Sequence, residues 1–193
     1  MQIIKTEFPG LFLVKPRILE DHRGYFYEAF NYRTFRDLTG IDITFVQDNQ
    51  STSHFGVMRG LHYQLEPYGQ AKLVRVLHGR IVDVVVDLRR DSPTFGKSYT
   101  LEMSHEDHTQ IFVPKGFAHG FVVLSEKAEV IYKCDAFYTP AEERGLYYND
   151  PVLNIDWRVA EEDIIISEKD KKLPLLKDAE YNFSYSGHST IIP

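Results

Sequence analysis

Short apolar or alternating segments, separated by Gly, Pro and charged residues, run along most of the chain. The strongest is residues 81–88, a run of Val and Ile in which Asp83 and Asp87 share one face with Val85. Many short segments with turn residues between them predict a sandwich or barrel of β-strands. The expected strands are residues 10–14, 24–30, 43–47, 72–77, 81–88, 98–103, 110–113, 120–124 and 129–134.

Connections and helices are marked by turn and cap residues. His78-Gly79, between two of these strands, predicts a hairpin turn. Residues 31–38 predict a helix, capped by Asn31 and stopped by Gly40. A second short helix is expected over residues 167–170. No repeat, linker or βαβ alternation appears, so we expect one domain over residues 1–193, with residues 182–193 as a mobile tail.

Composition narrows the classes of partner. The 193 residues carry 22 Lys and Arg against 28 Asp and Glu, a formal charge of −6. A net acidic chain is a poor partner for nucleic acid, whose phosphates need a basic face. No apolar run is long enough to cross a membrane, and residues 1–10 contain no signal-peptide core. The single cysteine, Cys134, suits a reducing compartment, so we expect a cytoplasmic protein.

Two of the eight histidines stand in unusual surroundings. His62 and His119 lie among apolar residues and glycines, whereas solvated positions are expected for the rest that stand in turns, loops or the tail: His78, His105, His108 and His188. Two buried histidines satisfied by the backbone would be the simplest interpretation. A metal site would need three or more ligands, and Gln64 stands where a second imidazole would be required, so no metal is expected.

Acid–base chemistry without metal is the remaining interpretation of this pair. A neutral imidazole removes a proton near pH 7 when a carboxylate holds its other nitrogen. By residue type Asp83, Asp87 and Asp170 are candidates for that carboxylate, and spacing alone does not choose among them.

Four cationic residues flank the two histidines in strand-like segments: Arg23, Arg59, Lys72 and Arg75. A cation inside a barrel is costly unless it meets an anion, and pyrophosphate suits bidentate arginine. The alternative is that they lie on exposed strand faces and form weak salt bridges. Because they gather around His62 and His119, we favour a cradle for an anionic substrate.

Ordered motifs connect these residues to a known family. The chain closely resembles the dTDP-4-dehydrorhamnose 3,5-epimerases over roughly residues 10–176. The matching stretches, which keep the family's order, are residues 21–28, 45–49, 59–64, 70–76, 83–89, 91–96, 113–121, 130–133, 149–150 and 166–170.

The resemblance implies a mainly β fold, the cupin-type double-stranded β-helix or jelly roll, with a few short helices. It implies a homodimer that works without metal or other cofactor on dTDP-4-dehydro-6-deoxy-D-glucose, inverting C3 and C5 to give dTDP-4-dehydro-L-rhamnose. A sister enzyme that inverts one carbon, a metal-dependent cupin oxygenase and a non-catalytic sugar-nucleotide-binding module are the alternatives.

The resemblance also implies residue roles. His62 is the expected proton acceptor with Asp170 as its orienting partner, Tyr132 the proton donor, and Lys72 the group that stabilises the enolate. Phe26 and Tyr138 are the expected thymine-stacking aromatics. The expected contacts to nucleotide, phosphates or sugar are Arg23, Glu28, Gln47, Asn49, Arg59, His119, Glu143 and Lys169.

Overall fold

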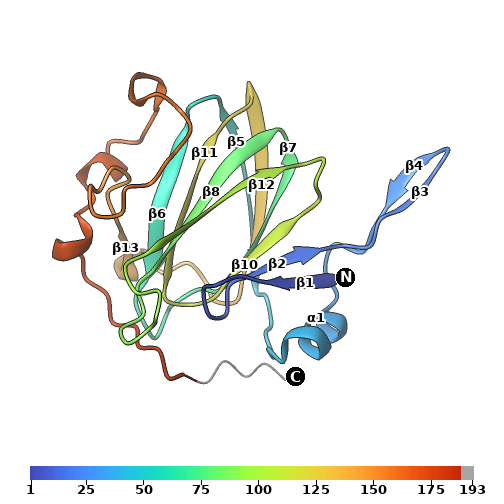
Figure 1. Ribbon diagram of the computed structural model, residues 1–193, viewed down its shortest axis with the longest axis horizontal. Coiled ribbons are helices and arrows are strands. Elements are labelled where there is room, and N and C mark those ends of the chain that lie inside the picture. Colours follow the sequence, from blue (N-terminus) through green and yellow to red (C-terminus); the bar gives the residue numbers. More distant parts are fainter. Residues whose placement is uncertain (188–193) are drawn as a thin grey trace.

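Two antiparallel sheets pack face to face in the computed structural model, which describes residues 1–187 (Figure 1). The first sheet has the order β1 (Gln2–Lys5), β2 (Phe12–Lys15), β10 (Gln110–Val113), β7 (Lys72–His78), β12 (Lys127–Cys134) and β5 (Gln47–His54). The second has the order β13 (Glu143–Gly145), β6 (Met58–Gln64), β11 (Phe117–Val123), β8 (Arg80–Asp87) and β9 (Ser98–Ser104).

The chain crosses between the sheets at most connections from β5 to β13, which is the jelly-roll pattern. The predicted mainly β jelly roll is thereby confirmed. Residues 78–79 are not a hairpin turn, because β7 and β8 belong to different sheets. Gly79, at a φ of 77°, instead lets the chain turn a corner from one sheet to the other.

Apolar side chains fill three layers. Strand β8 is mostly apolar because both of its faces are buried. Ile81 and Val85 pack between the sheets, while Val82, Val84 and Val86 pack on the outer face. That outer face is covered by the C-terminal part of the chain, including Trp157. A third cluster lies on the outer side of the six-stranded sheet, beneath Phe35 of helix α1 (Tyr32–Thr39).

The helix prediction was close, and several strand predictions were not. Asn31 caps α1 by accepting a hydrogen bond from the Thr34 backbone at 3.1 Å, and Gly40 ends it at a φ of 71°. The strand predicted over residues 43–47 begins only at Gln47, because Ile43 packs into the third cluster as part of a loop. The predicted helix over residues 167–170 is a 3₁₀ turn, η3, at Asp170–Lys172.

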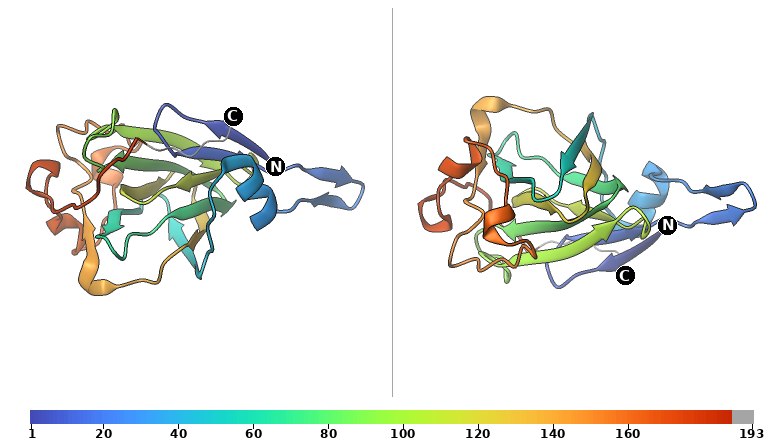
Figure 2. Two further views of the ribbon diagram at one scale, coloured as in Figure 1. Left: turned by 90° about the horizontal axis from the view of Figure 1, so that it is seen from below. Right: turned by 90° about the horizontal axis from the view of Figure 1, so that it is seen from above.

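Other 3₁₀ turns are η1 (Pro140–Glu142), η2 (Glu161–Asp163) and η4 (Leu176–Asp178). The strand predicted over residues 24–30 is only β4 (Gly24–Phe26), which pairs with β3 (Leu19–Asp21). This hairpin projects away from the barrel in all three views (Figures 1 and 2). Its apolar side chains are exposed, and Phe26 retains 69% of its accessible surface.

The first residues of the expected tail pack against the barrel. Phe183 is buried, and its carbonyl accepts a hydrogen bond from the Arg90 backbone at 3.0 Å. Ser184 forms a parallel bridge with Arg90. Residues 188–193, with His188, lie outside the described residues. Over the described part of the chain, no helix has the length and apolar character needed to cross a membrane.

Candidate active site

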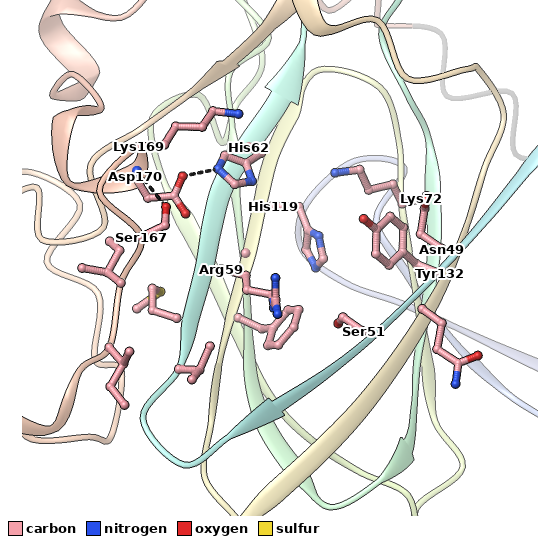
Figure 3. Close-up of a pocket in the computed structure, with 17 residues that line it drawn as sticks. Asn49, Ser51, Arg59, His62, Lys72, His119, Tyr132, Ser167, Lys169 and Asp170 are labelled. Carbon is pink, nitrogen blue, oxygen red and sulfur yellow. Dashed lines mark hydrogen bonds and ion pairs between the residues drawn. The ribbon is translucent and has the colours of Figure 1, made fainter.

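A cavity of about 510 Å³ lies inside the barrel between the two sheets (Figure 3). Polar side chains reach it from β5, β6, β7, β11 and β12, and residues 165–170 close one side. Its polar lining is Asn49, Gln50, Ser51, Arg59, His62, Lys72, His119, Tyr132, Ser167, Lys169 and Asp170.

His62 and His119 are direct neighbours. They pair in register across β6 and β11, so their side chains emerge on the same face of the sheet. The strands approach closely beside them. A Cβ at Gly60 would stand 2.7 Å from the Gly120 Cα, and a Cβ at Gly120 would stand 2.6 Å from the Arg59 carbonyl oxygen. Only glycine fits at these positions, and the register shift beside them sets how the two imidazoles are presented.

Asp170 is the carboxylate partner of His62. Its Oδ1 lies 2.7 Å from His62 Nε2, and its own backbone N–H donates to Ser167 Oγ at 3.1 Å. Burial tends to raise the pKa of Asp170, but hydrogen bonds from His62, Ser167 and the Gly60 backbone outweigh it and hold the pKa below its ordinary value. The carboxylate therefore stays ionised and orients a half-exposed imidazole whose Nδ1 is free of this bond.

Asp83 makes a second pair, with His119. The distance from Asp83 Oδ2 to His119 Nε2 is 2.8 Å, and both side chains are buried. The other oxygen, Oδ1, is buried without a hydrogen-bond partner among the described residues. Asp87, the third candidate acid, is unrelated to either histidine. It forms a bidentate ion pair with Arg89 in the β8–β9 region.

The opposite wall carries Tyr132 and Lys72. Lys72 Nζ lies 5.8 Å from the centre of the Tyr132 ring. Burial raises the pKa of the Tyr132 hydroxyl, so this group keeps its proton at neutral pH. Burial lowers the pKa of Lys72, against the attraction of Cys134, Asp83 and Glu143. Figure 3 shows both side chains facing His62 across the cavity.

A hydrogen-bonded chain joins further expected residues at the cavity rim. Glu143 accepts from Lys169 Nζ, and from the Tyr138 hydroxyl at 2.8 Å. Burial tends to raise the pKa of Glu143, but these two bonds outweigh it, so the pKa is lowered. Gln47 accepts from the Tyr138 backbone at 3.0 Å and donates to Asn49 at 3.1 Å.

The structure thus gathers most of the expected site. Eight predicted residues line the cavity, and Gln47, Tyr138 and Glu143 connect to it. Three predicted residues do not reach it: Arg23, Phe26 and Glu28. Arg23 pairs with Asp21 on the projecting hairpin, and Glu28 accepts from Asn31.

The predicted cationic cradle is wrong for Arg75, and Arg23 lies on the projecting hairpin of this chain. Arg59 and Lys72 line the cavity, with Arg59 Nε donating to Ser53 Oγ at 2.9 Å. Arg75 alternates with Lys72 on β7, so its side chain emerges on the outer face, where Nη1 donates to the Tyr27 hydroxyl at 3.3 Å. Lys169 supplies the third cation of the lining.

Ser51 and Ser53, on the polar face of β5, were not predicted from the sequence, although Gln47 and Asn49 on the same face were. Gln47, Asn49, Ser51 and Ser53 alternate along this strand and lie on its less exposed side. Ser51 Oγ lines the cavity and is buried without a hydrogen-bond partner among the described residues. The period of two in these polar residues is a signal for a polar inner wall.

One ring nitrogen of each histidine in the cavity is paired with an aspartate. His62 Nε2 and His119 Nε2 each face a carboxylate. Within residues 1–187, no three His, Cys, Asp or Glu side chains are grouped as metal ligands. The chemistry that these groups offer is proton removal on one wall, proton delivery on the other, and cationic stabilisation of an oxyanion between them.

Comparison with known proteins decides the family. The model of the dTDP-4-dehydrorhamnose 3,5-epimerase family matches residues 5–178. The chain belongs to this family. The dTDP-4-dehydrorhamnose 3,5-epimerase of Shigella flexneri is 47% identical over 181 residues, which are 94% of this chain and 99% of the relative.

Solved structures of family members superpose closely. The dTDP-4-dehydrorhamnose 3,5-epimerase of Elizabethkingia anophelis has a TM-score of 0.89 at 52% identity, covering 92% of this chain and 97% of the other. The Legionella pneumophila epimerase in complex with dTDP-4-keto-L-rhamnose has a TM-score of 0.88 at 46% identity, covering 92% and 93%. The resemblance seen in the sequence is confirmed.

Proposed function

We propose that this chain inverts C3 and C5 of dTDP-4-dehydro-6-deoxy-D-glucose and releases dTDP-4-dehydro-L-rhamnose. The observation that carries the proposal is the placement of His62 with Asp170 on one wall and Tyr132 with Lys72 on the other. C3 and C5 both flank the C4 ketone, so loss of a proton from either carbon gives an enolate. Inversion needs a base and an acid on opposite faces of the sugar, and the two walls supply them.

Each inversion consists of the removal of a proton from carbon and the return of a proton to the opposite face. His62 Nδ1 accepts the carbon-bound proton, and the electron pair of that bond forms the enolate, whose oxyanion the Lys72 ammonium stabilises. Tyr132 then gives its hydroxyl proton to the opposite face of the carbon, and the double bond returns to the C4 carbonyl. Solvent exchange carries the proton of the imidazolium back to the tyrosinate, so no metal and no redox cofactor is needed.

The nucleotide is bound by charge and stacking. Arg59 and Lys169 are cations that suit the diphosphate, and Tyr138 at the rim suits thymine. The remaining polar contacts to the substrate are assigned to Gln47, Asn49, His119 and Glu143.

A homodimer accounts for the three expected residues that lie far from this cavity. Arg23, Phe26 and Glu28 lie on or after the projecting β3–β4 hairpin, where Phe26 is exposed. In a dimer the hairpin of one chain reaches the cavity rim of the other and adds a cation and an aromatic ring to the nucleotide site. No nucleic acid or membrane takes part, and the reduced Cys134 suits the cytoplasm.

Proton exchange in heavy water tests the reaction. Incubation with dTDP-4-dehydro-6-deoxy-D-glucose is expected to introduce deuterium at both C3 and C5. Uptake at one carbon alone would make the chain a single-carbon epimerase, and binding without uptake would make it a binding module. Activity that a chelator abolishes and iron or manganese restores would contradict the metal-free reaction.

A further inference from the structure

The β3–β4 hairpin has two different faces. Tyr25 and Tyr27 are two residues apart, and their rings stack with centroids 5.9 Å apart, so both lie on one face. Phe26 emerges on the other face, opposite Leu19 in the strand pairing. Both Phe26 and Leu19 are exposed. One face is therefore occupied by tyrosines, and the other presents the expected nucleotide-stacking ring.

His108, from the loop between β9 and β10, meets the tyrosine face. The centre of its ring lies 4.7 Å from that of Tyr25 and 5.1 Å from that of Tyr27. These distances are within the range of favourable aromatic pairs. The imidazole is only half-exposed, so the expectation of a solvated His108 is wrong.

The backbone of His108 lies in the left-handed region, with a φ of 51°. Asparagine, aspartate and histidine are the side-chain-bearing residues that are enriched in this region. Asparagine can therefore replace His108 without a change of backbone conformation, and the two residues differ there mainly in the aromatic ring.

Two hydrogen bonds hold the segment that follows β4, whereas His108 contacts β4 itself. Arg75 donates to the Tyr27 hydroxyl, and the Gln110 side chain donates to the Ala29 carbonyl at 2.7 Å. Both partners follow β4 in the chain. His108 reaches further out, because Tyr25 lies within β4 itself.

We propose that His108 is a positioning residue that sets the direction in which the hairpin presents Phe26 and Arg23 to the nucleotide. The proposal rests on the proposed function, in which this hairpin contributes to substrate binding. The ring of His108 acts through Tyr25 and Tyr27 and touches no substrate. Its loss therefore weakens substrate binding and leaves the chemical step, which takes place inside the barrel, unchanged.

The test compares His108→Asn with His108→Phe. Asparagine suits the left-handed backbone but removes the ring, so the melting temperature is expected to stay equal or rise. KM for the dTDP-sugar and the Kd for dTDP are expected to rise about two- to tenfold with kcat unchanged. Phenylalanine restores the ring and is expected to restore KM. His105→Asn in the same loop, whose ring packs on His78, is the matched control and is expected to leave KM unchanged.

Arg23→Ala distinguishes a failure of the His108 role from a failure of the proposed hairpin site. If Arg23→Ala raises KM while His108→Asn does not, the hairpin binds substrate and the role of His108 is refuted. If neither variant changes KM or the Kd for dTDP in an active enzyme, the hairpin takes no part in binding, and both the proposed hairpin site and the role of His108 fail. A fall in kcat with unchanged KM in His108→Asn also overturns the proposal.

Discussion

His62 and His119 stand opposite each other on neighbouring strands, and each imidazole is held by its own aspartate, at 2.7 Å and 2.8 Å. The pairs differ in access. The His62 side chain retains 27% of its accessible surface, whereas that of His119 retains 7%. A base must meet substrate and exchange its proton, so the more accessible His62 suits that role. The buried His119 suits a fixed polar contact.

The first prediction concerns Asp170→Asn. An asparagine amide donates to His62 Nε2, which places the imidazole proton on Nδ1 and so removes the proposed base. We expect kcat to fall by roughly 10²–10⁴-fold, with the Kd for dTDP nearly unchanged. Steady-state kinetics and calorimetric titration with dTDP measure the two quantities. Glu168→Gln, an exposed carboxylate paired with Lys171, is the control. A large loss of dTDP binding in Asp170→Asn would assign the aspartate to the nucleotide site instead.

The sequence predicts the site better than it predicts the strands around it. His62, Asp170, Lys72 and Tyr132 come from three strands and a distant loop, and the family motifs identify them together. Residues alone leave Asp83, Asp87 and Asp170 equivalent, because the pairing of β11 with β8 brings Asp83 to His119, and the packing of η3 against β6 brings Asp170 to His62. Such pairing joins residues far apart in the chain and leaves no local pattern.

Local sequence patterns also mislead where two consecutive strands pair with other strands instead of with each other. His78-Gly79 has the composition of a hairpin turn, yet β7 and β8 pair with other strands in different sheets. The alternation in β7 separates Lys72 from Arg75 but does not say which face is inside. Only the packing of Val74 and Val76 between the two sheets shows that Lys72 faces inward and that Arg75 is outside the cavity.

The second prediction concerns the basic limb of the pH profile. In the proposed reaction Lys72 stabilises the enolate only as a cation, and burial lowers its pKa from the ordinary 10.5. Activity should therefore fall as pH rises through this lowered pKa, earlier than an exposed lysine would allow. The pKa of Tyr132 is raised, so its ionisation is not the cause of the limb. Lys72→Met should abolish turnover. Tyr132→Phe should retain some exchange of substrate protons with solvent, and the rate of that exchange should still fall at high pH. A limb that disappears with Tyr132→Phe would reassign it to the tyrosine.

The third prediction concerns charge in the cavity. If Arg59 contacts the diphosphate, its removal should weaken dTDP binding. It should also reduce the dependence of the Kd on salt, because salt screens the attraction between Arg59 and the diphosphate, and the variant lacks that attraction. Titrations at low and high salt compare wild type with Arg59→Ala. Arg80→Ala, which removes an exposed arginine paired with Glu102, is the matched control and should leave binding unchanged. Equal affinity of Arg59→Ala and wild type at low salt would refute the contact.

The last prediction concerns stability away from the site. Asp87 is fully buried and accepts bonds from Arg89, Ser92 and Thr94. Burial tends to raise its pKa, but those bonds outweigh it, so the folded pKa lies below the ordinary 3.8. Asp87→Ala leaves the Arg89 charge unpaired and should cost about 3–5 kcal/mol of unfolding free energy at pH 7.

The dependence on pH has a definite sign. Because the pKa of Asp87 is lowered by folding, its stabilisation is present above pH 3.8 and is lost as pH falls through the folded pKa. Urea unfolding should therefore give a constant difference between wild type and Asp87→Ala from pH 5 to 8, and a smaller one at pH 3. Asp37→Ala removes an exposed partner of Arg36, at 3.8 Å, and should cost less than about 1 kcal/mol at either pH. A difference for Asp87→Ala that persisted unchanged at pH 3 would show that lost packing, and not the ionised carboxylate, accounts for the destabilisation.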